Sequence, residues 1–242
     1  MKSVSILITN YNSYEAIETC LLSISKRTRY PHELIVYDDR SDNGVDLEFL
    51  RRQRDIGWIE LVEGKERLGH GGGLDALING FCKADIAVIL DCDIMIKEAG
   101  WLEEAVALID DKTILACGLS DVSRTKGTIP LWLESWFMVL NMNAYRDGMQ
   151  VGWGTWSVRK GGFFYPTGFR LQHKIKFENP RGYKLATPLP ASLKRKYLHF
   201  IHASCLGTLN PKDIQKNSDI VDVRERLFNR IRVELNKLKG EP

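Results

Sequence analysis

The first 118 residues alternate between short apolar runs and segments with helical periodicity. Residues 4–9 and 86–90 are apolar runs of the kind found in strands that are buried on both faces of a sheet. Further strands are predicted at residues 33–37, 58–62 and 114–118. The alternation predicts an α/β fold, a Rossmann-like open and mostly parallel twisted sheet with helices on both faces.

Helices are predicted between these strands. The first follows Asn12, with Glu15 three residues later in the arrangement of a capping box. Its apolar stripe consists of Ile17, Cys20, Leu21 and Ile24. Other helices are expected at about residues 45–54 and 72–82, and around residues 102–109.

The pattern becomes less regular after residue 118. Aromatic residues without a clear period crowd this region: Trp132, Trp136, Phe137, Trp153, Trp156, Phe163, Phe164 and Tyr165. Such residues usually pack in a core, and the alternative is that some line a surface for a sugar or lipid acceptor. Residues 221–239 have the pattern of a basic amphipathic helix. Docking of its apolar face on the domain is expected, with attachment to an anionic membrane surface as the alternative.

Composition narrows the class of protein. The 242 residues, 44% of them hydrophobic, suffice for one large domain, and a formal charge of +3 gives no case for a nucleic acid partner. No apolar run reaches the roughly 18 residues of a membrane span, and no signal peptide precedes the first strand. The cysteines are scattered without zinc-site spacing: Cys20, Cys82, Cys92, Cys117 and Cys205. We therefore expect buried free thiols and a cytoplasmic protein.

An aspartate pair one residue apart follows the apolar run at residues 86–90. Asp91 and Asp93 point to the same side of an extended chain, so the two carboxylates can share one divalent cation. Oxygen ligands of this kind suit Mg²⁺ or Mn²⁺, which would bridge to a diphosphate. A pair of solvated turn aspartates is the alternative.

Polar residues also follow two other predicted strands, at residues 9–12 and 38–39. Ligands of open parallel sheets bind beyond the carboxyl ends of the strands, which gives these clusters a common location. Tyr11 can stack on a base and Asp39 can accept a hydrogen bond from a base or ribose. The structural alternatives are a packed turn residue for Tyr11 and a turn or capping group for Asp39.

A glycine-rich segment, Gly69-His70-Gly71-Gly72-Gly73, precedes a predicted helix and could let the backbone approach a phosphate or sugar closely. A dinucleotide-binding fingerprint would need glycine where Leu74 stands, which argues against a Rossmann oxidoreductase. Arg67 is a candidate phosphate contact, and His70 is expected to be a loop residue.

Four segments in this order carry a resemblance to a known family: residues 4–13 (VSILITNYNS), 34–41 (LIVYDDRS), 69–73 (GHGGG) and 90–93 (LDCD). They resemble the inverting nucleotide-sugar glycosyltransferases of family 2, which have the GT-A fold. The chain looks most like the rhamnosyltransferase-type branch, whose loop has the form Gly-Phe-Gly-Gly-Gly. The resemblance covers residues 3–118 well and the remainder weakly.

The resemblance implies roles for individual residues. Thr9, Tyr11 and Asp39 would hold the nucleoside, Asp91 would contact the ribose and the metal region, and Asp93 would be the main metal-coordinating acid. A later histidine would complete the metal shell, with His199 preferred over His202. The implied nucleotide-binding set is Thr9, Tyr11, Asp39, Arg67, Gly69, Gly71, Asp91 and Cys92. The implied metal set for Mn²⁺ or Mg²⁺ is Asp91, Asp93 and His199.

The chain departs from the family at the catalytic base. Such enzymes place an acid in the acceptor half, and the comparable segment here, Tyr165-Pro166-Thr167-Gly168, has proline at that position. The base, if present, has four candidates: Asp121, Glu134, Asp147 and Glu178.

The resemblance implies an inverting, metal-dependent transfer of a sugar from a UDP-, dTDP- or GDP-linked donor to a glycan or lipid-linked acceptor, as in cell-surface polysaccharide synthesis. Residues 1–118 would bind the donor, 119–210 would form the acceptor side, and 211–242 would be the basic C-terminal helix, with peripheral contact to the inner membrane face as one option. A nucleotidyltransferase is disfavoured because residues 9–13 lack its signature. A non-catalytic nucleotide-sugar-binding or scaffold protein is the other alternative.

Overall fold

The computed structural model describes residues 1–109, 111–120, 133–154, 156–158, 163–165, 167–186, 189–200 and 218–240. Its centre is a seven-stranded sheet in the order β10-β6-β7-β4-β1-β2-β3. The strands are β1 (Val4–Asn10), β2 (Glu33–Asp38), β3 (Glu60–Glu63), β4 (Ile86–Asp91), β6 (Ile114–Ser120), β7 (Leu133–Asn141) and β10 (Lys184–Ala186).

The sheet is mostly parallel, as predicted. Strand β1 pairs in parallel with β2 and β4, β2 with β3, and β6 with β10. Within this described sheet, β7 alone runs antiparallel to its neighbours, β4 and β6. The predicted α/β class is therefore confirmed, and the antiparallel strand is an addition that the irregular pattern after residue 118 did not reveal.

Two short antiparallel pairs complete the strands. One joins β5 (Ile94–Ile96) to β11 (Tyr197–His199), and the other joins β8 (Trp156–Val158) to β9 (Phe163–Tyr165). The pairing of β5 with β11 brings β11 close to Asp93, because β5 begins directly after Asp93.

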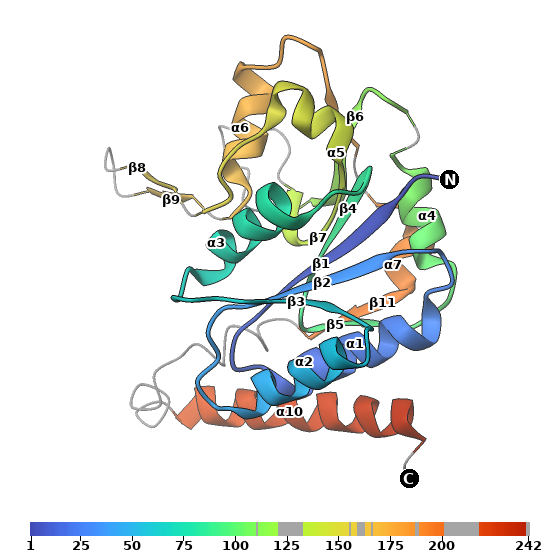
Figure 1. Ribbon diagram of the computed structural model, residues 1–242, viewed down its shortest axis with the longest axis vertical. Helices are drawn as coiled ribbons and strands as arrows, with labels where there is room; N and C mark the ends of the chain where they lie inside the picture. The colour runs from blue at the N-terminus through green and yellow to red at the C-terminus, as the bar shows by residue number, and fades with distance from the viewer. Residues whose placement is uncertain are drawn as a thin grey trace.

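Helices cover both faces of the sheet (Figure 1). One face packs on α1 (Tyr14–Arg27), α2 (Val45–Asp55), α4 (Trp101–Ala107) and α7 (Ala191–Arg195). The other packs on α3 (Gly69–Asp75), η1 (Ala76–Phe81), α5 (Met142–Ala144), η3 (Tyr145–Met149) and α6 (Phe169–Phe177). In β1, Ile6 and Ile8 face the first group and Leu7 the second, which explains why this run is apolar throughout.

The predicted capping role of Asn12 is wrong. Asn12 adopts a φ of 47° and its amide donates to Asp42 Oδ1 at 2.7 Å. Ser13 precedes the first helical residue instead, and its backbone N–H donates to Asp46 Oδ1 at 2.7 Å. The helix start is thus held by an acid of a different loop.

Several aromatic residues of the second half pack in the core, as expected. Phe137 and Trp153 are fully buried, whereas Trp136 is only partly buried. Trp132 lies outside the described residues, and Trp156, Phe163, Phe164 and Tyr165 are described only as strand residues. Cys20, Cys82, Cys92 and Cys117 are buried free thiols, as predicted, and Cys205 lies outside the described residues.

The C-terminal helix α10 (Ser218–Lys239) docks on α1. Ile231 and Leu238 are buried in a cluster with Met95 and Phe200. Arg232 and Lys239 form ion pairs with Glu15 and Glu18 of α1, at 2.9 and 2.8 Å. The apolar face of α10 therefore covers the domain.

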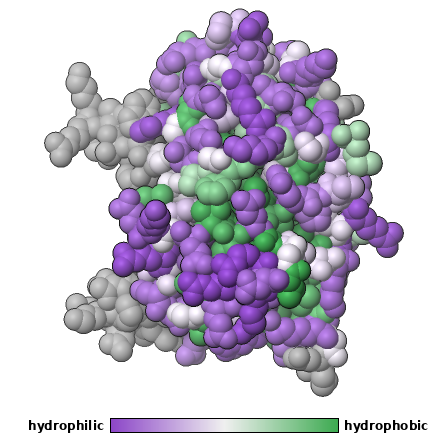
Figure 2. All heavy atoms as spheres, in the orientation of Figure 1, coloured by the Kyte–Doolittle hydropathy of each residue, from purple (hydrophilic) through white to green (hydrophobic). Residues whose placement is uncertain are grey.

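The outer face of α10 is largely hydrophilic, as the lower part of the molecule in Figure 2 shows. Its exposed basic residues include Arg226, Arg230 and Lys237. No helix in the described parts of the chain has the length and apolar character that crossing a membrane requires.

Candidate active site

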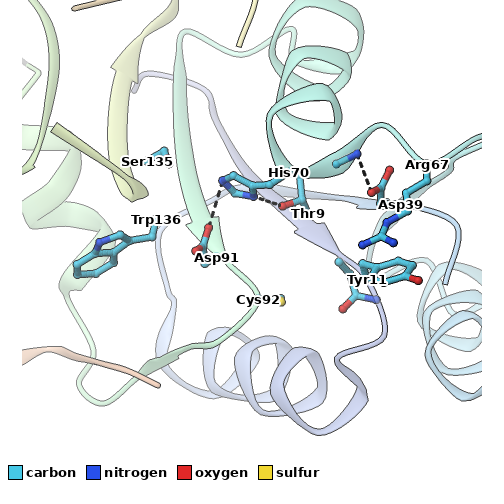
Figure 3. Close-up of a pocket in the computed structure, with 11 residues that line it drawn as sticks. Thr9, Tyr11, Asp39, Arg67, His70, Asp91, Cys92, Ser135 and Trp136 are labelled. Carbon is cyan, nitrogen blue, oxygen red and sulfur yellow. Dashed lines mark hydrogen bonds and ion pairs between the residues drawn. The ribbon is translucent and has the colours of Figure 1, made fainter. Parts of the chain in front are cut away.

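The carboxyl ends of β1, β2 and β4 meet at one edge of the sheet. Thr9 lies between Tyr37 and Asp91 in the parallel ladders, so the three polar clusters are brought together as the pattern predicted. They border a cavity of about 240 Å³ (Figure 3). Its lining residues are Thr9, Asn10, Tyr11, Asp39, Arg67, Gly69, His70, Asp91, Cys92, Ser135 and Trp136.

A buried polar network fixes the loops after β1 and β2. The Asn10 amide donates to Asp38 Oδ2 at 3.0 Å and to Asp46 Oδ1 at 2.9 Å. Burial raises the pKa of Asp38, although hydrogen bonds from Ser41 and Asn10 oppose the shift. The sequence pattern assigned no role to Asn10 or Asp46. For Asn10 the one signal in the sequence was its place as a polar residue at the end of an apolar strand.

One end of the cavity carries Tyr11, Arg67 and Asp39. The Arg67 guanidinium lies 3.9 Å from the centre of the Tyr11 ring, a cation–π contact. The two Asp39 carboxylate oxygens accept the backbone N–H groups of Leu68 and Gly69, at 2.7 and 2.9 Å. Asp39 therefore ties the glycine-rich segment to β2 and keeps acceptor capacity for a ligand.

The glycines of this segment have different roles. Gly69 lines the cavity and has a φ of 72°. Gly71 is not a lining residue. A Cβ there would lie 2.7 Å from the Trp153 carbonyl oxygen, and one at Gly73 would lie 2.9 Å from the Tyr37 ring. The segment therefore needs glycines at 71 and 73 for close packing against neighbouring residues.

A cluster with the composition of a metal site lies next to the cavity on the side of Trp136, and Asp91 is the member that lines the cavity. One ligand atom from each of Asp91, Asp93 and His199 lies within 4.8 Å of the others. His199 pairs with Ile94 in the β5–β11 ladder, and its Nε2 lies 3.2 Å from Asp93 Oδ1. The Trp136 ring stacks on the imidazole with centroids 4.1 Å apart. Strand β11 thus delivers His199 to the aspartate pair, and β7 supports its ring.

The electrostatics of the cluster favour a cation. Burial, together with the charges of Asp93 and Glu134, raises the pKa of Asp91 to about 7, and His199 opposes the shift. Asp91 Oδ1 is buried, yet accepts no hydrogen bond from the described residues. Two carboxylates and an imidazole are suitable ligands for a divalent ion such as Mn²⁺. A bound ion would also give Asp91 Oδ1 the partner that it lacks among the described residues.

His70 lies in the middle of the cavity wall (Figure 3). Its Nδ1 is 2.9 Å from Thr9 Oγ1 and its Nε2 is 3.6 Å from Asp91 Oδ1. Desolvation lowers the pKa of His70 below its usual range, although 36% of the side chain stays exposed. The imidazole is therefore neutral at neutral pH. The expectation that His70 is a loop residue is wrong, because the glycine-rich segment does not precede a helix but forms the start of α3. From this helix the His70 side chain bridges β1 and Asp91.

The four candidates for the base lie in different places. Glu134 is the second residue of β7, next to the lining residue Ser135, and its charge acts on Asp91. Asp147 accepts a hydrogen bond from the Tyr183 hydroxyl at 2.9 Å and borders a different cavity with Asp85, at the opposite end of β4.

The remaining two candidates are Glu178 and Asp121. Glu178 is exposed at the C-terminal end of α6, and Asp121 lies outside the described residues. So do Pro166 and His202. Of the three acids that lie in the described residues, Glu134 is the one that the structure places beside the cavity.

This fold and site define a glycosyltransferase of the GT-A class. The chain belongs to glycosyl transferase family 2, whose family model matches residues 5–165. The predicted family is therefore confirmed. No curated protein sequence matches the chain.

Solved structures share the fold at low identity. The mannosyltransferase PcManGT from Pyrobaculum calidifontis, in complex with GDP-Man and Mn²⁺, is 20% identical over 98% of this chain and 73% of its own, with a TM-score of 0.56. GalNAc-T7 with UDP, GalNAc and Mn²⁺ is 14% identical over 65% of this chain and 39% of its own, with a TM-score of 0.53. Only part of this second structure therefore has a counterpart here.

Proposed function

We propose that this protein transfers a sugar from a nucleoside diphosphate donor to an acceptor hydroxyl with inversion. The observation that carries the proposal is a single cavity that joins an aromatic and acidic end, Tyr11 and Asp39, to the acid cluster at Asp91. This spacing suits a ligand with a base at one end and a charged diphosphate toward the other. The complexes of PcManGT with GDP-Man and of GalNAc-T7 with UDP support this ligand class.

Asp91, Asp93 and His199 would hold the divalent metal, with Mn²⁺ favoured over Mg²⁺ because imidazole is among the ligands. A bound metal of this kind offsets the negative charge that develops on the leaving diphosphate. The Mn²⁺ in the PcManGT and GalNAc-T7 structures supports the proposal.

Glu134 is proposed as the catalytic base. The acceptor oxygen bonds to the anomeric carbon as the bond from that carbon to the diphosphate oxygen breaks, and the hydroxyl proton passes to the Glu134 carboxylate. Attack from the face opposite the leaving group inverts the anomeric centre. The position of Glu134 beside Ser135 and Trp136, at the sugar side of the cavity, supports this role.

The acceptor is proposed to be a glycan or lipid-linked glycan of the cell surface. Residues 1–118 would bind the donor and 119–210 the acceptor, and the outer basic face of α10 would meet the inner membrane face. The segment Gly69-His70-Gly71-Gly72-Gly73 supports the rhamnosyltransferase-type branch.

The function is tested by measuring nucleoside diphosphate release from UDP-, GDP- and dTDP-sugars with Mn²⁺ and a panel of glycan acceptors. We expect release from donors of one base, its loss in Asp93→Ala, and its retention in the distant control Asp147→Asn. Donor binding without release for any acceptor would contradict transfer and would favour a non-catalytic nucleotide-sugar-binding protein, which the absent acid at Pro166 also suggests.

A further inference from the structure

We propose that His70 binds the diphosphate of the donor through its Nε2 atom. The inference rests on the proposed function, because it assumes that a nucleoside diphosphate occupies the cavity. It assigns a role to a side chain that the transfer reaction described above does not use.

The place of His70 in the cavity carries the inference. Tyr11, Asp39 and Arg67 lie at one end, and Trp136 with Ser135 lies at the other (Figure 3). A nucleoside diphosphate sugar that spans the cavity would put its base at the first end and its sugar at the second. The diphosphate then lies between them, where His70 stands over Asp91.

The hydrogen-bond geometry selects the atom that faces the ligand. Both ring nitrogens of an imidazole can take part in hydrogen bonds, and a nitrogen that carries a proton donates. Nε2 lies 3.6 Å from the Asp91 carboxylate, and Nδ1 lies 2.9 Å from the Thr9 hydroxyl. A proton on Nε2 avoids placing two lone pairs face to face, and the Thr9 hydroxyl then donates to Nδ1. Nε2–H is thus a donor on the cavity side, as an anionic oxygen requires.

The backbone that carries His70 is held in place before a ligand binds. Asp39 accepts the N–H of Gly69, and Gly71 packs against the carbonyl oxygen of Trp153 so closely that a Cβ would not fit. A donor fixed in this way loses little freedom on binding, so its hydrogen bond contributes more of its energy to affinity.

Three substitutions of His70 distinguish diphosphate binding through Nε2 from a purely structural role through the Nδ1 contact with the Thr9 hydroxyl. His70→Phe removes both nitrogens and gives the segment the loop form Gly-Phe-Gly-Gly-Gly. In His70→Gln the amide can reach the place of Nε2. In His70→Asn it can reach only the place of Nδ1, and so preserves the Thr9 contact alone.

The experiment measures, by calorimetry, the dissociation constant of the best-binding diphosphate among UDP, GDP and dTDP, and of its parent nucleoside. In His70→Phe and His70→Asn we expect diphosphate affinity to fall about tenfold, the loss typical of one hydrogen bond to a charged group, with nucleoside affinity unchanged. His70→Gln should stay within about threefold of the wild type.

Three results would overturn the inference: equal losses for diphosphate and nucleoside, rescue by Asn but not by Gln, or no loss in His70→Phe. Thermal melting of each variant reports on folding, and the comparison of Gln with Asn remains valid if loss of the ring lowers stability. A wild-type protein that binds no diphosphate would instead overturn the proposed function itself, together with this inference.

Discussion

The two ends of the cavity are built in different ways. The end proposed for the nucleoside, here the nucleoside end, takes Tyr11 and Asp39 from the residues that directly follow β1 and β2, two adjacent parallel strands. The end proposed for the metal, here the metal end, joins the residues after β4 to Trp136 on β7 and His199 on β11, which are far apart in the chain. The residues of the nucleoside end could be predicted from the local sequence pattern. Those of the metal end come together only through the pairing of β7 with β4 and of β11 with β5.

The largest predicted effect is a loss of transfer rate on substitution of Glu134, the proposed catalytic base on β7. Glu134→Gln keeps the size of the side chain but removes the base, so the transfer rate should fall about 10²- to 10⁴-fold. At pH 8 and saturating Mn²⁺ the affinity for the nucleoside diphosphate should not change, because Glu134 is not among the residues that line the cavity. Steady-state kinetics and calorimetry measure the two quantities, with Asp147→Asn as the control. A rate within threefold of the wild type would exclude Glu134 as the base.

The stack of Trp136 on His199 tests whether the metal end depends on β7. Trp136→Leu removes the surface that orients the imidazole, and Mn²⁺ affinity should fall about 10- to 100-fold, as for other residues that orient metal ligands. Trp136→Phe should recover most of the affinity. Electron paramagnetic resonance of free Mn²⁺ reports binding without nucleotide. Trp58→Leu is a control away from the cavity, and equal losses in both leucine variants would argue for a general loss of stability.

The close packing of Gly71, in the glycine-rich segment, can be tested through the stability of the protein. Gly71→Ala forces a Cβ against the Trp153 carbonyl and should lower the free energy of unfolding by about 1–3 kcal/mol. Gly80→Ala is the matched control, because a Cβ at that position would meet no atom within 4 Å apart from its chain neighbours and the backbone of its own helix. Urea denaturation measures both variants. Equal stability of the two would show that the close approach at Gly71 is tolerated.

The metal end should also respond to pH. Because the pKa of Asp91 is raised to about 7, its carboxyl is protonated at pH 5.5 and ionised at pH 8, and protons compete with the metal. Mn²⁺ affinity should therefore rise by about tenfold or more from pH 5.5 to 8 and level off above 7. Glu134→Gln removes a charge that raises this pKa, so its profile should shift to lower pH. A flat profile would show that Asp91 is already ionised at pH 5.5.

The same contrast explains what the sequence could predict. The apolar runs at residues 4–9 and 86–90 identify β1 and β4, because strands covered on both faces carry apolar side chains at nearly every position. Because each of these strands could be identified, and because parallel strands align their carboxyl ends, Asp91 and Tyr11 could also be placed at the same edge of the sheet.

Other parts depend on contacts that no local pattern encodes. The antiparallel β7 forms within a stretch of weak periodicity, so neither its direction nor the place of Trp136 could be predicted. The resemblance implied His199 as a ligand, and only the β5–β11 ladder shows how it reaches Asp93. The contacts of His70 could not be predicted, because His70 lies in α3 and its partner Thr9 lies in β1, 61 residues earlier in the chain.

The central claim is that the acid cluster and the nucleoside end act as one donor site. Its most direct test is calorimetry of the preferred nucleoside diphosphate with and without Mn²⁺, in the wild type and in Asp93→Asn. We predict that Mn²⁺ tightens binding at least tenfold in the wild type and has no effect in Asp93→Asn. Equal tightening by Mn²⁺ in both proteins would contradict the account.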